Sequence, residues 1–224
     1  MLEDILLRRR GFIRAIMYRF QVAVLTHDHV LASRLRDEGL RRGLKVVHVT
    51  SAGDIPLSVR VVISRRGECG DIRSWSVIYA EDFPSPVSLL DKAVEVAAGR
   101  ADAKTATISI DPGSRIGVAY MVADLLVRTG TYTDLEGLER DLREFISSHR
   151  GLTPNVVIGS GAPQYRERLI RMIRSIPGLG DAPIEIVSEE GTSRRGFVGG
   201  GRRGRDERAA ANLALRRGHV RTTP

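Results

Sequence analysis

The stretch that most constrains the fold is residues 105–121, TATISIDPGSRIGVAYM, in which two apolar runs of β-forming residues flank a short turn. Asp, Pro, Gly and Ser each favour a bent backbone, and all four lie together between the two runs. A connection this short joins neighbouring strands only as an antiparallel hairpin. The sequence therefore predicts a hairpin with one carboxylate, Asp111, at the point where its first strand ends.

The alternation of side chains along this strand divides its residues between two faces. Thr107, Ser109 and Asp111 share one face, and Ile108 and Ile110 share the other. The face with Asp111 carries small residues, so another element can approach it closely. A carboxylate in this position can bind a metal ion, although an Asp before Pro-Gly also commonly just begins a turn.

The elements that follow the hairpin alternate between strands and helices. A helix is expected after Thr133, which with Glu136 forms a capping-box pattern, and another begins at Pro163. Further strands are expected at 125–129, 155–158 and 184–187, and a last helix at 206–217. The order from residue 104 to 224 is therefore βββαβαβα in a mixed sheet, with three antiparallel strands followed by parallel ones.

The first half of the chain shows a different pattern of short apolar strands separated by helical segments. Strands are expected at 21–25, 45–49, 59–64 and 76–79, and helices at 30–42 and 87–98. This alternation favours a parallel sheet in a small three-layer, Rossmann-like α/β unit. The small, polar residues 99–104 suit a domain boundary. We expect a leader or short helix at 1–17, an α/β domain of unknown role at 18–100, and a second α/β domain at 104–224.

The predicted last helix carries a second carboxylate on its apolar side. Residues at helical spacing place Asp206 on the same side as Ala209, Ala210, Leu213 and Ala214. The alanines permit a short distance to a sheet. An inward carboxylate is costly unless it is paired or binds metal, although Asp is also common as an N-terminal helix cap.

Arginines dominate the segment between the last strand and the last helix. The chain has a formal net charge of +8 and a pI near 10.3, and a single cysteine, Cys69. Arginine grips phosphate with a planar fork, so a basic, glycine-rich loop can follow a phosphate backbone, and a Phe can stack on a base. A solvated surface loop is the alternative. The candidate residues are Arg194, Arg195, Phe197, Arg202, Arg203 and Arg205.

The remaining features point to a cytoplasmic protein without a membrane partner. One cysteine excludes an intrachain disulfide, and no apolar run reaches transmembrane length. His27, Asp28, His29 and His48 form the other group of possible ligands. We favour a cap of the following helix by Asp28, with the histidines at the surface.

Several of these segments together resemble a known family. The element order with an acid ending the first strand is similar to the ribonuclease H-like fold, and ISIDPGSRIGVAY resembles the opening motif of the RuvC and YqgF group of Holliday junction resolvase-like nucleases. Residues 157–159 resemble the fourth strand of that group, 188–193 its YqgF-type segment, and 206–210 its Asp-x-x-Ala-Ala motif.

The resemblance implies a magnesium-dependent nuclease that cuts branched DNA or folded RNA. Asp111 would be shared by two Mg²⁺ or Mn²⁺ ions, Glu189 would bind one of them and Asp206 the other, with Glu190 as the substitute for Glu189. Resolution of a four-way junction would need two sites and hence a homodimer. Two other classes stay open, an inactive nucleic-acid-binding protein with the same fold and an ATP-binding protein of the actin-like and sugar kinase superfamily.

Overall fold

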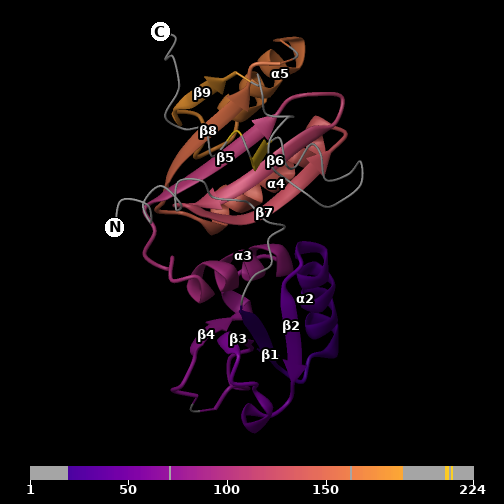
Figure 1. Cartoon of the computed structure of the whole chain (residues 1–224), viewed down its shortest axis with the longest axis vertical. Helices are drawn as coiled ribbons and strands as arrows, with labels where there is room; N and C mark the ends of the chain where they lie inside the picture. The colour runs from indigo at the N-terminus through magenta and orange to yellow at the C-terminus, as the bar shows by residue number, and fades with distance from the viewer. Residues whose placement is uncertain (1–19, 71, 162, 189–209, 212, 214–224) are drawn as a thin grey trace, which may run out of the picture.

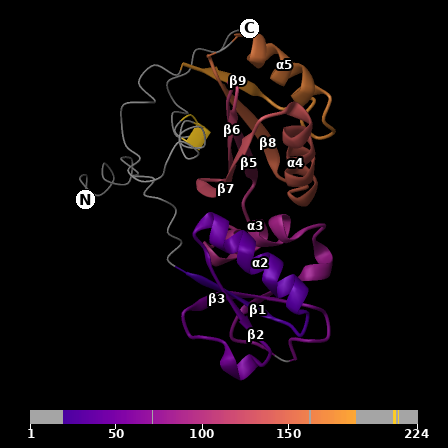
Figure 2. The ribbon, with the colours of Figure 1, turned by 90° about the vertical axis from the view of Figure 1, so that its right-hand side faces the viewer.

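The computed structural model describes residues 20–70, 72–161, 163–188, 210, 211 and 213. These residues form an α/β protein with two sheets, of which the first lies in the first half of the chain and the second in the second half (Figure 1). Helix α3 lies between the two sheets in this view and after a quarter turn (Figure 2).

The first sheet contains four parallel strands in the order β2-β1-β3-β4. Each strand has the bounds expected from its short β-branched run. The strands are β1 (Gln21–Leu25), β2 (Lys45–Val49), β3 (Val59–Ser64) and β4 (Ser76–Tyr79), the helices are α2 (His29–Arg42) and α3 (Pro86–Ala97), and two short 3₁₀ helices are η1 (Ala52–Asp54) and η2 (Ala80–Asp82). The predicted parallel α/β unit is confirmed.

The three-layer arrangement expected for this unit is wrong for the part of the chain that the structure describes. Helices α2 and α3 contact each other and pack on the same face of the sheet, through Leu35 and Leu90. On the opposite face, loop residues such as Trp75 pack against Ala23 and Val62. The connections before β3 and β4 contain no α-helix that could cover this face.

Helix α2 packs closely on β2 at Gly39. A Cβ atom at this position would lie 2.4 Å from Val46 Cγ2 and 3.0 Å from the Leu44 carbonyl oxygen. We predict that Gly39→Ala lowers the free energy of unfolding by about 1–3 kcal/mol, because the clash outweighs the helix propensity gained. Urea denaturation measures the change. Gly53→Ala is the control, since its Cβ would meet only Ser51 Oγ at 3.8 Å; equal stability of the two variants would contradict the prediction.

The second sheet contains five strands in the order β7-β6-β5-β8-β9. Strands β5, β6 and β7 are antiparallel neighbours, whereas β8 and β9 run parallel to β5. The elements are β5 (Thr105–Asp111), β6 (Ile116–Val122), β7 (Leu125–Tyr132), α4 (Leu135–Ser148), β8 (Thr153–Gly159), α5 (Pro163–Arg174) and β9 (Ile184–Val187). The predicted order βββαβαβ is thus confirmed as far as β9.

The expected start of α4 differs by one residue from the observed start. Strand β7 continues to Tyr132, and the N-cap is Asp134 rather than Thr133. The Gly137 amide donates to Asp134 Oδ1 at 2.7 Å. Both residue types cap helices well, so the spacing of Thr133 and Glu136 did not distinguish them.

The second sheet is covered on both faces. Helices α4 and α5 lie on one side of it, and the helical residues Ala210, Ala211 and Leu213 lie on the other side (Figure 2). The first face buries Ile108 and Ile110. Ala210, Ala211 and Leu213 are at most 3% exposed, so they pack directly against the sheet.

One continuous core joins the two sheets through α3. Eight of the twelve residues of α3 are buried, which is far more than the single apolar stripe of a surface helix. Leu90 and Val94 belong to the same cluster of buried residues as Val61 of β3 and Val127 of β7. The helix is therefore a shared wall between the two sheets.

A buried ionic network accompanies this core. Asp91 of α3 accepts from Arg42 of α2 at 2.6 Å and from Arg128 of β7 at 2.9 Å. Arg128 also donates to Asp141 of α4 at 2.7 Å, and its guanidinium lies 3.9 Å from the centre of the Tyr120 ring. Burial alone would raise the pKa of Asp141, but the Arg128 charge and hydrogen bonds from Arg128 and Tyr120 outweigh it, and the pKa lies below its usual value.

A second polar contact crosses between the halves one turn further along α3. His149, at the C-terminal end of α4, contacts Glu95 with 2.6 Å between Nε2 and Oε1. Both side chains are almost completely buried. The two contacts of α3 fix its rotation relative to the second sheet, because each requires a particular side chain to face a particular partner.

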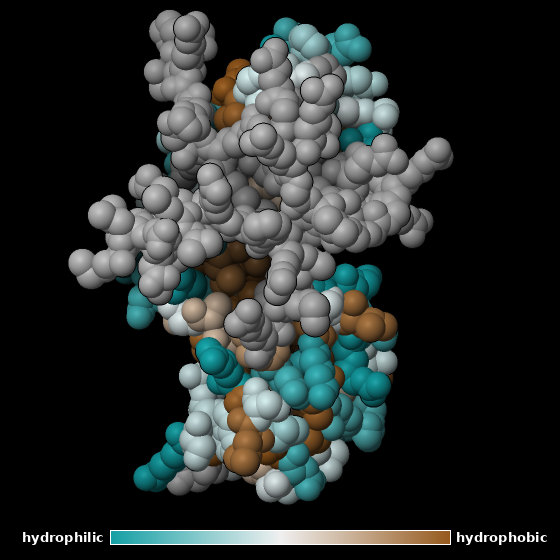
Figure 3. Space-filling model, viewed as in Figure 1, coloured by the Kyte–Doolittle hydropathy of each residue, from teal (hydrophilic) through white to brown (hydrophobic). Residues whose placement is uncertain are grey.

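Apolar side chains on the surface are scattered. Separate brown patches stand among hydrophilic surface in Figure 3. The large apolar side chains exposed in the described part of the chain are Val30, Leu40, Leu57, Tyr165 and Ile186. Among those same residues, the structure has no helix that is both long and apolar enough to cross a membrane.

Candidate active site

Asp111 is the last residue of β5, the central strand of the second sheet. Its side chain is half-buried, so a ligand can reach it. Ser109, two residues earlier and on the same face, is completely buried, and its hydroxyl has no hydrogen-bond partner among the described residues. The predicted hairpin is confirmed, with Asp111 paired to Gly117 of β6.

Glycines lie on both sides of Asp111. Gly117 is its partner on β6. On β8, Ile158 pairs with Ile110, so the next residue, Gly159, lies beside Asp111 on that side. Two large side chains on either side would block access of a ligand to a carboxylate, because directly opposed Cβ atoms are only about 4.5–5.5 Å apart. Both neighbours of Asp111 in its own row therefore lack a side chain.

The carboxyl end of β9 reaches the same edge of the sheet. Strands β5, β8 and β9 are parallel, and Val187 pairs with Gly159. Val187 therefore lies in the same row as Asp111, two strand spacings or about 10 Å away. Ser188, the residue after Val187, therefore lies at the end of the sheet where Asp111 is located.

Ala210, Ala211 and Leu213 cover the face of the second sheet to which the Asp111 side chain points, here called the Asp111 face. Ala119, the partner of Ser109, packs against Ala210 and Ala211. Leu213 packs against Val157 and Val187. The sequence predicted that Ala210 and Leu213 would approach a face of small residues, and both are completely buried there. Ala211 is an additional contact that helical spacing alone did not indicate.

The other predicted site residues lie outside the described residues. These are Glu189, Glu190, Asp206, Arg194, Arg195, Phe197, Arg202, Arg203 and Arg205. Within the described ranges, no group of three or more His, Cys, Asp or Glu side chains could hold a metal ion. Asp111 is thus the one predicted metal ligand that the structure places.

Asp28 and His48, near the end of β1, contact backbone groups. Asp28 caps α2 by accepting from the Val30 and Leu31 amides at 3.0 and 2.9 Å. The Leu31 hydrogen bond, opposed in part by burial and aided by Arg65, holds the pKa of Asp28 below its usual value. His48 contacts the Thr26 carbonyl oxygen at 2.9 Å. The expected capping role of Asp28 is confirmed.

Gly117 and Gly159 were missed in the sequence because their importance depends on pairing register. Gly117 stands inside the motif that contains Asp111, and Gly159 ends a short apolar run. A glycine at the end of a strand, next to a chain that must approach closely, is the signal that could have found them.

No protein-family model matches this chain, and no curated protein sequence matches it.

Proposed function

We propose that this chain is a metal-dependent endonuclease that hydrolyses phosphodiesters in structured nucleic acid. The observation that carries the proposal is the position of Asp111 at the end of the central strand, between two glycines and on the face that Ala210 and Leu213 cover. This position, the sheet order β7-β6-β5-β8-β9 and the motif around Asp111 support a ribonuclease H-like domain of the RuvC and YqgF type at residues 104–224. Residues 18–100 would then form a small α/β domain with a Rossmann-like parallel sheet, packed on the second domain through α3.

The proposal assigns the third acid to Glu189 rather than Glu190. Val187 packs with Leu213 and Val157 on the Asp111 face. Side chains alternate along an extended chain, so a continuation of β9 would give Glu189 the same face as Val187. Glu190 would take the face of Ile186. The packing of Val187 on the Asp111 face thus supports Glu189 over Glu190 as the proposed third acid.

Asp206 is assigned to the same site by helical spacing. Ala210 packs over β6 beside the row that contains Asp111. Residues four apart lie on one face of a helix, so Asp206 would face the sheet one turn before Ala210. The packing of Ala210 on β6 therefore supports the proposal that Asp206 approaches Asp111 from this face of the sheet.

The chemistry follows from the oxygen ligands that these residues would offer. Magnesium and manganese prefer carboxylate oxygens and water as ligands. The glycines beside Asp111 leave room for a metal ion and its bound water. Bound divalent ions would supply positive charge beside the scissile phosphate and activate the attacking water. Asp111, Glu189 and Asp206 would hold the ions, and the arginines from 194 to 205 would bind the phosphate backbone.

The test uses the full chain and labelled substrates. We expect cleavage of a four-way DNA junction or of a folded RNA in Mg²⁺ or Mn²⁺, loss of cleavage in EDTA, and recovery when excess metal is added. A linear duplex of the same sequence is the control for structure preference. Salt-sensitive binding without cleavage in either ion would indicate a nucleic-acid-binding protein instead. Nucleotide binding without affinity for DNA or RNA would overturn both.

A further inference from the structure

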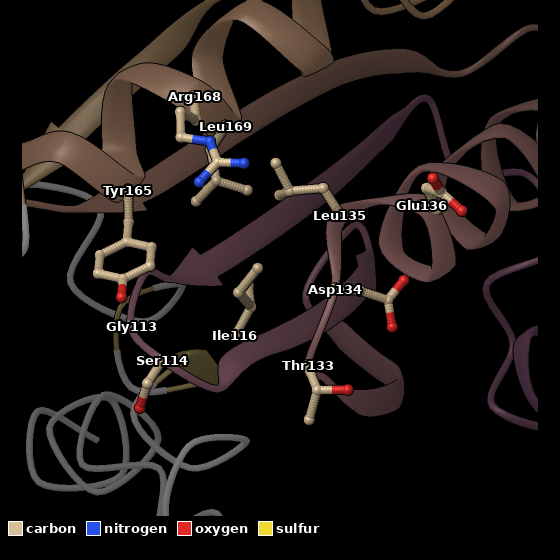
Figure 4. Close-up of a pocket in the computed structure, with 10 residues that line it drawn as sticks. All are labelled: Gly113, Ser114, Ile116, Thr133, Asp134, Leu135, Glu136, Tyr165, Arg168 and Leu169. Atoms are coloured by element: carbon tan, nitrogen blue, oxygen red, sulfur yellow. The ribbon is translucent and has the colours of Figure 1, made fainter.

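A cavity of about 390 Å³ lies next to the turn that follows Asp111 (Figure 4). Its walls come from the β5–β6 turn, the start of α4 and one side of α5. On α5, Tyr165, Arg168 and Leu169 share one face of the helix, since they are three and four residues apart. All these elements meet at the edge of the sheet where β5 ends.

The inner surface of the cavity is mainly apolar. Ile116, Leu135 and Leu169 line it from a strand and two helices. The ring of Tyr165 stands at one side, with its hydroxyl toward Gly113 and Ser114 (Figure 4). Tyr165 is 36% exposed. An exposed aromatic ring beside an aliphatic floor suits a flat, unsaturated ligand.

Arg168 gives the cavity a free positive charge. Its guanidinium points into the space between Tyr165 and Leu135 (Figure 4). Within the described part of the chain it makes no hydrogen bond or ion pair. Neither acid at the rim forms an ion pair with it among the described residues: Asp134 caps α4 by accepting from the Gly137 amide, and the Glu136 side chain points away from the cavity.

The cavity is poorly suited to a phosphate. An anion at the start of α4 would need the free amides of the first turn, but the carboxylate of Asp134 already occupies that place. Arg168 is the one unpaired cation among the described residues that line the cavity. An uncharged ring with polar edges uses the aromatic wall, the aliphatic floor and one arginine together, and a nucleobase has these properties.

The cavity lies across the β5–β6 turn from Asp111: Ile116, Leu135 and Leu169 belong to the core on the α4 and α5 side, and Asp111 faces the other side of the sheet. A nucleic-acid strand that crosses this end of the sheet passes both. Ser114 follows Asp111 by three residues, so their Cα atoms are at most about 11 Å apart. We propose that this cavity receives one unstacked nucleobase of the strand whose phosphodiester is placed at Asp111. The base stacks on Tyr165 and rests mainly on Leu135 and the edge of Ile116, and Arg168 hydrogen-bonds to its edge. This inference rests on the proposed nuclease function.

The test measures binding by the full chain in EDTA, so that it does not require cleavage. The probes are short single strands in which each nucleotide in turn is replaced by an abasic site. We expect that an abasic site at one position weakens binding by about tenfold, the usual worth of one stacked base. Tyr165→Ala should weaken binding of the intact strand by the same factor and make that position insensitive. Tyr165→Phe should behave like the wild type.

Arg171→Ala is the matched control. Arg171 is exposed on the same helix, one turn further on, and does not line the cavity. Its removal should weaken binding of every strand equally and leave the position effect intact. Thermal melting shows whether each variant is folded. Independent, multiplying losses from Tyr165→Ala and the abasic site would overturn the inference, as would equal affinity for all abasic strands.

The outcomes separate this inference from the proposed function. Metal-dependent cleavage without any Tyr165-dependent position would leave the nuclease proposal intact and remove the base pocket. A Tyr165-dependent position in EDTA, together with no cleavage in Mg²⁺ or Mn²⁺, would retain the pocket on a protein that binds nucleic acid without cutting it.

Discussion

Replacement of Asp111 by asparagine is expected to lower the rate of metal-dependent cleavage by at least about a hundredfold. Loss of a residue that only orients a metal ligand typically costs 10- to 100-fold in metal affinity or activity, and Asp111 is proposed to contact the metal itself. Asparagine has the shape of aspartate but no negative charge. The half-buried position between Gly117 and Gly159 accommodates it without a clash. The rate is measured on a junction or folded RNA at saturating protein.

The same variant also makes a prediction that does not depend on activity. Metal that binds only the folded state raises the melting temperature. We expect Mg²⁺ to raise the melting temperature of the wild type and to have no such effect on Asp111→Asn, while both melt alike in EDTA.

Asp181→Asn is the control for this pair of measurements. Asp181 is exposed and precedes β9, at the opposite edge of the sheet from Asp111. It removes the same charge and should leave the rate and the metal effect unchanged. If Asp111→Asn cut at the wild-type rate, Asp111 would not be a catalytic ligand.

Replacement of Asp91 by asparagine is expected to lower the free energy of unfolding by about 3–5 kcal/mol, the usual cost of breaking a buried ion pair from one side. Asp91 is completely buried between Arg42 and Arg128. The variant leaves two guanidinium groups close together without the carboxylate that compensates them. Guanidinium chloride would screen this charge effect, so urea denaturation is the measurement of choice.

The matched control is Asp124→Asn. Asp124 also pairs with an arginine, Arg100, at 2.6 Å, but its side chain is 75% exposed. Exposed pairs contribute little because water and salt screen them, so this variant should unfold at the same urea concentration as the wild type. A similar small effect of Asp91→Asn would show that the buried network contributes nothing to stability.

The sequence predicted the strands well because their signal is local. The β-branched runs at 21–25, 45–49, 59–64, 76–79 and 184–187 coincide with the observed strands. The alternation that separated Asp111 from Ile110 is a property of a single strand, and the hairpin followed from four turn residues. The close packing of Ala210 on the Asp111 face could be predicted because small residues were concentrated on both partners.

The features that the sequence did not reveal depend on contacts between distant segments. No local pattern marks Arg42 and Arg128 as partners of Asp91, because Asp91 lies 49 and 37 residues away from them. Likewise, Tyr165 and Arg168 form a pocket only because α5 packs beside the β5–β6 turn. The placement of both helices on one face of the first sheet also depends on the paths of the connections, which local patterns do not specify.

Helix α3 belongs to both halves of the molecule at once. Its apolar residues enter one core with β3 and with β7, and its carboxylates Asp91 and Glu95 reach Arg128 and His149. A fragment that began at residue 104 would expose the apolar side chains that α3 covers, such as Val127, and would remove Asp91 from Arg128 and Glu95 from His149. The most protected amide hydrogens of the two halves should therefore exchange in a single concerted opening. The first half thus stabilises the fold of the second half.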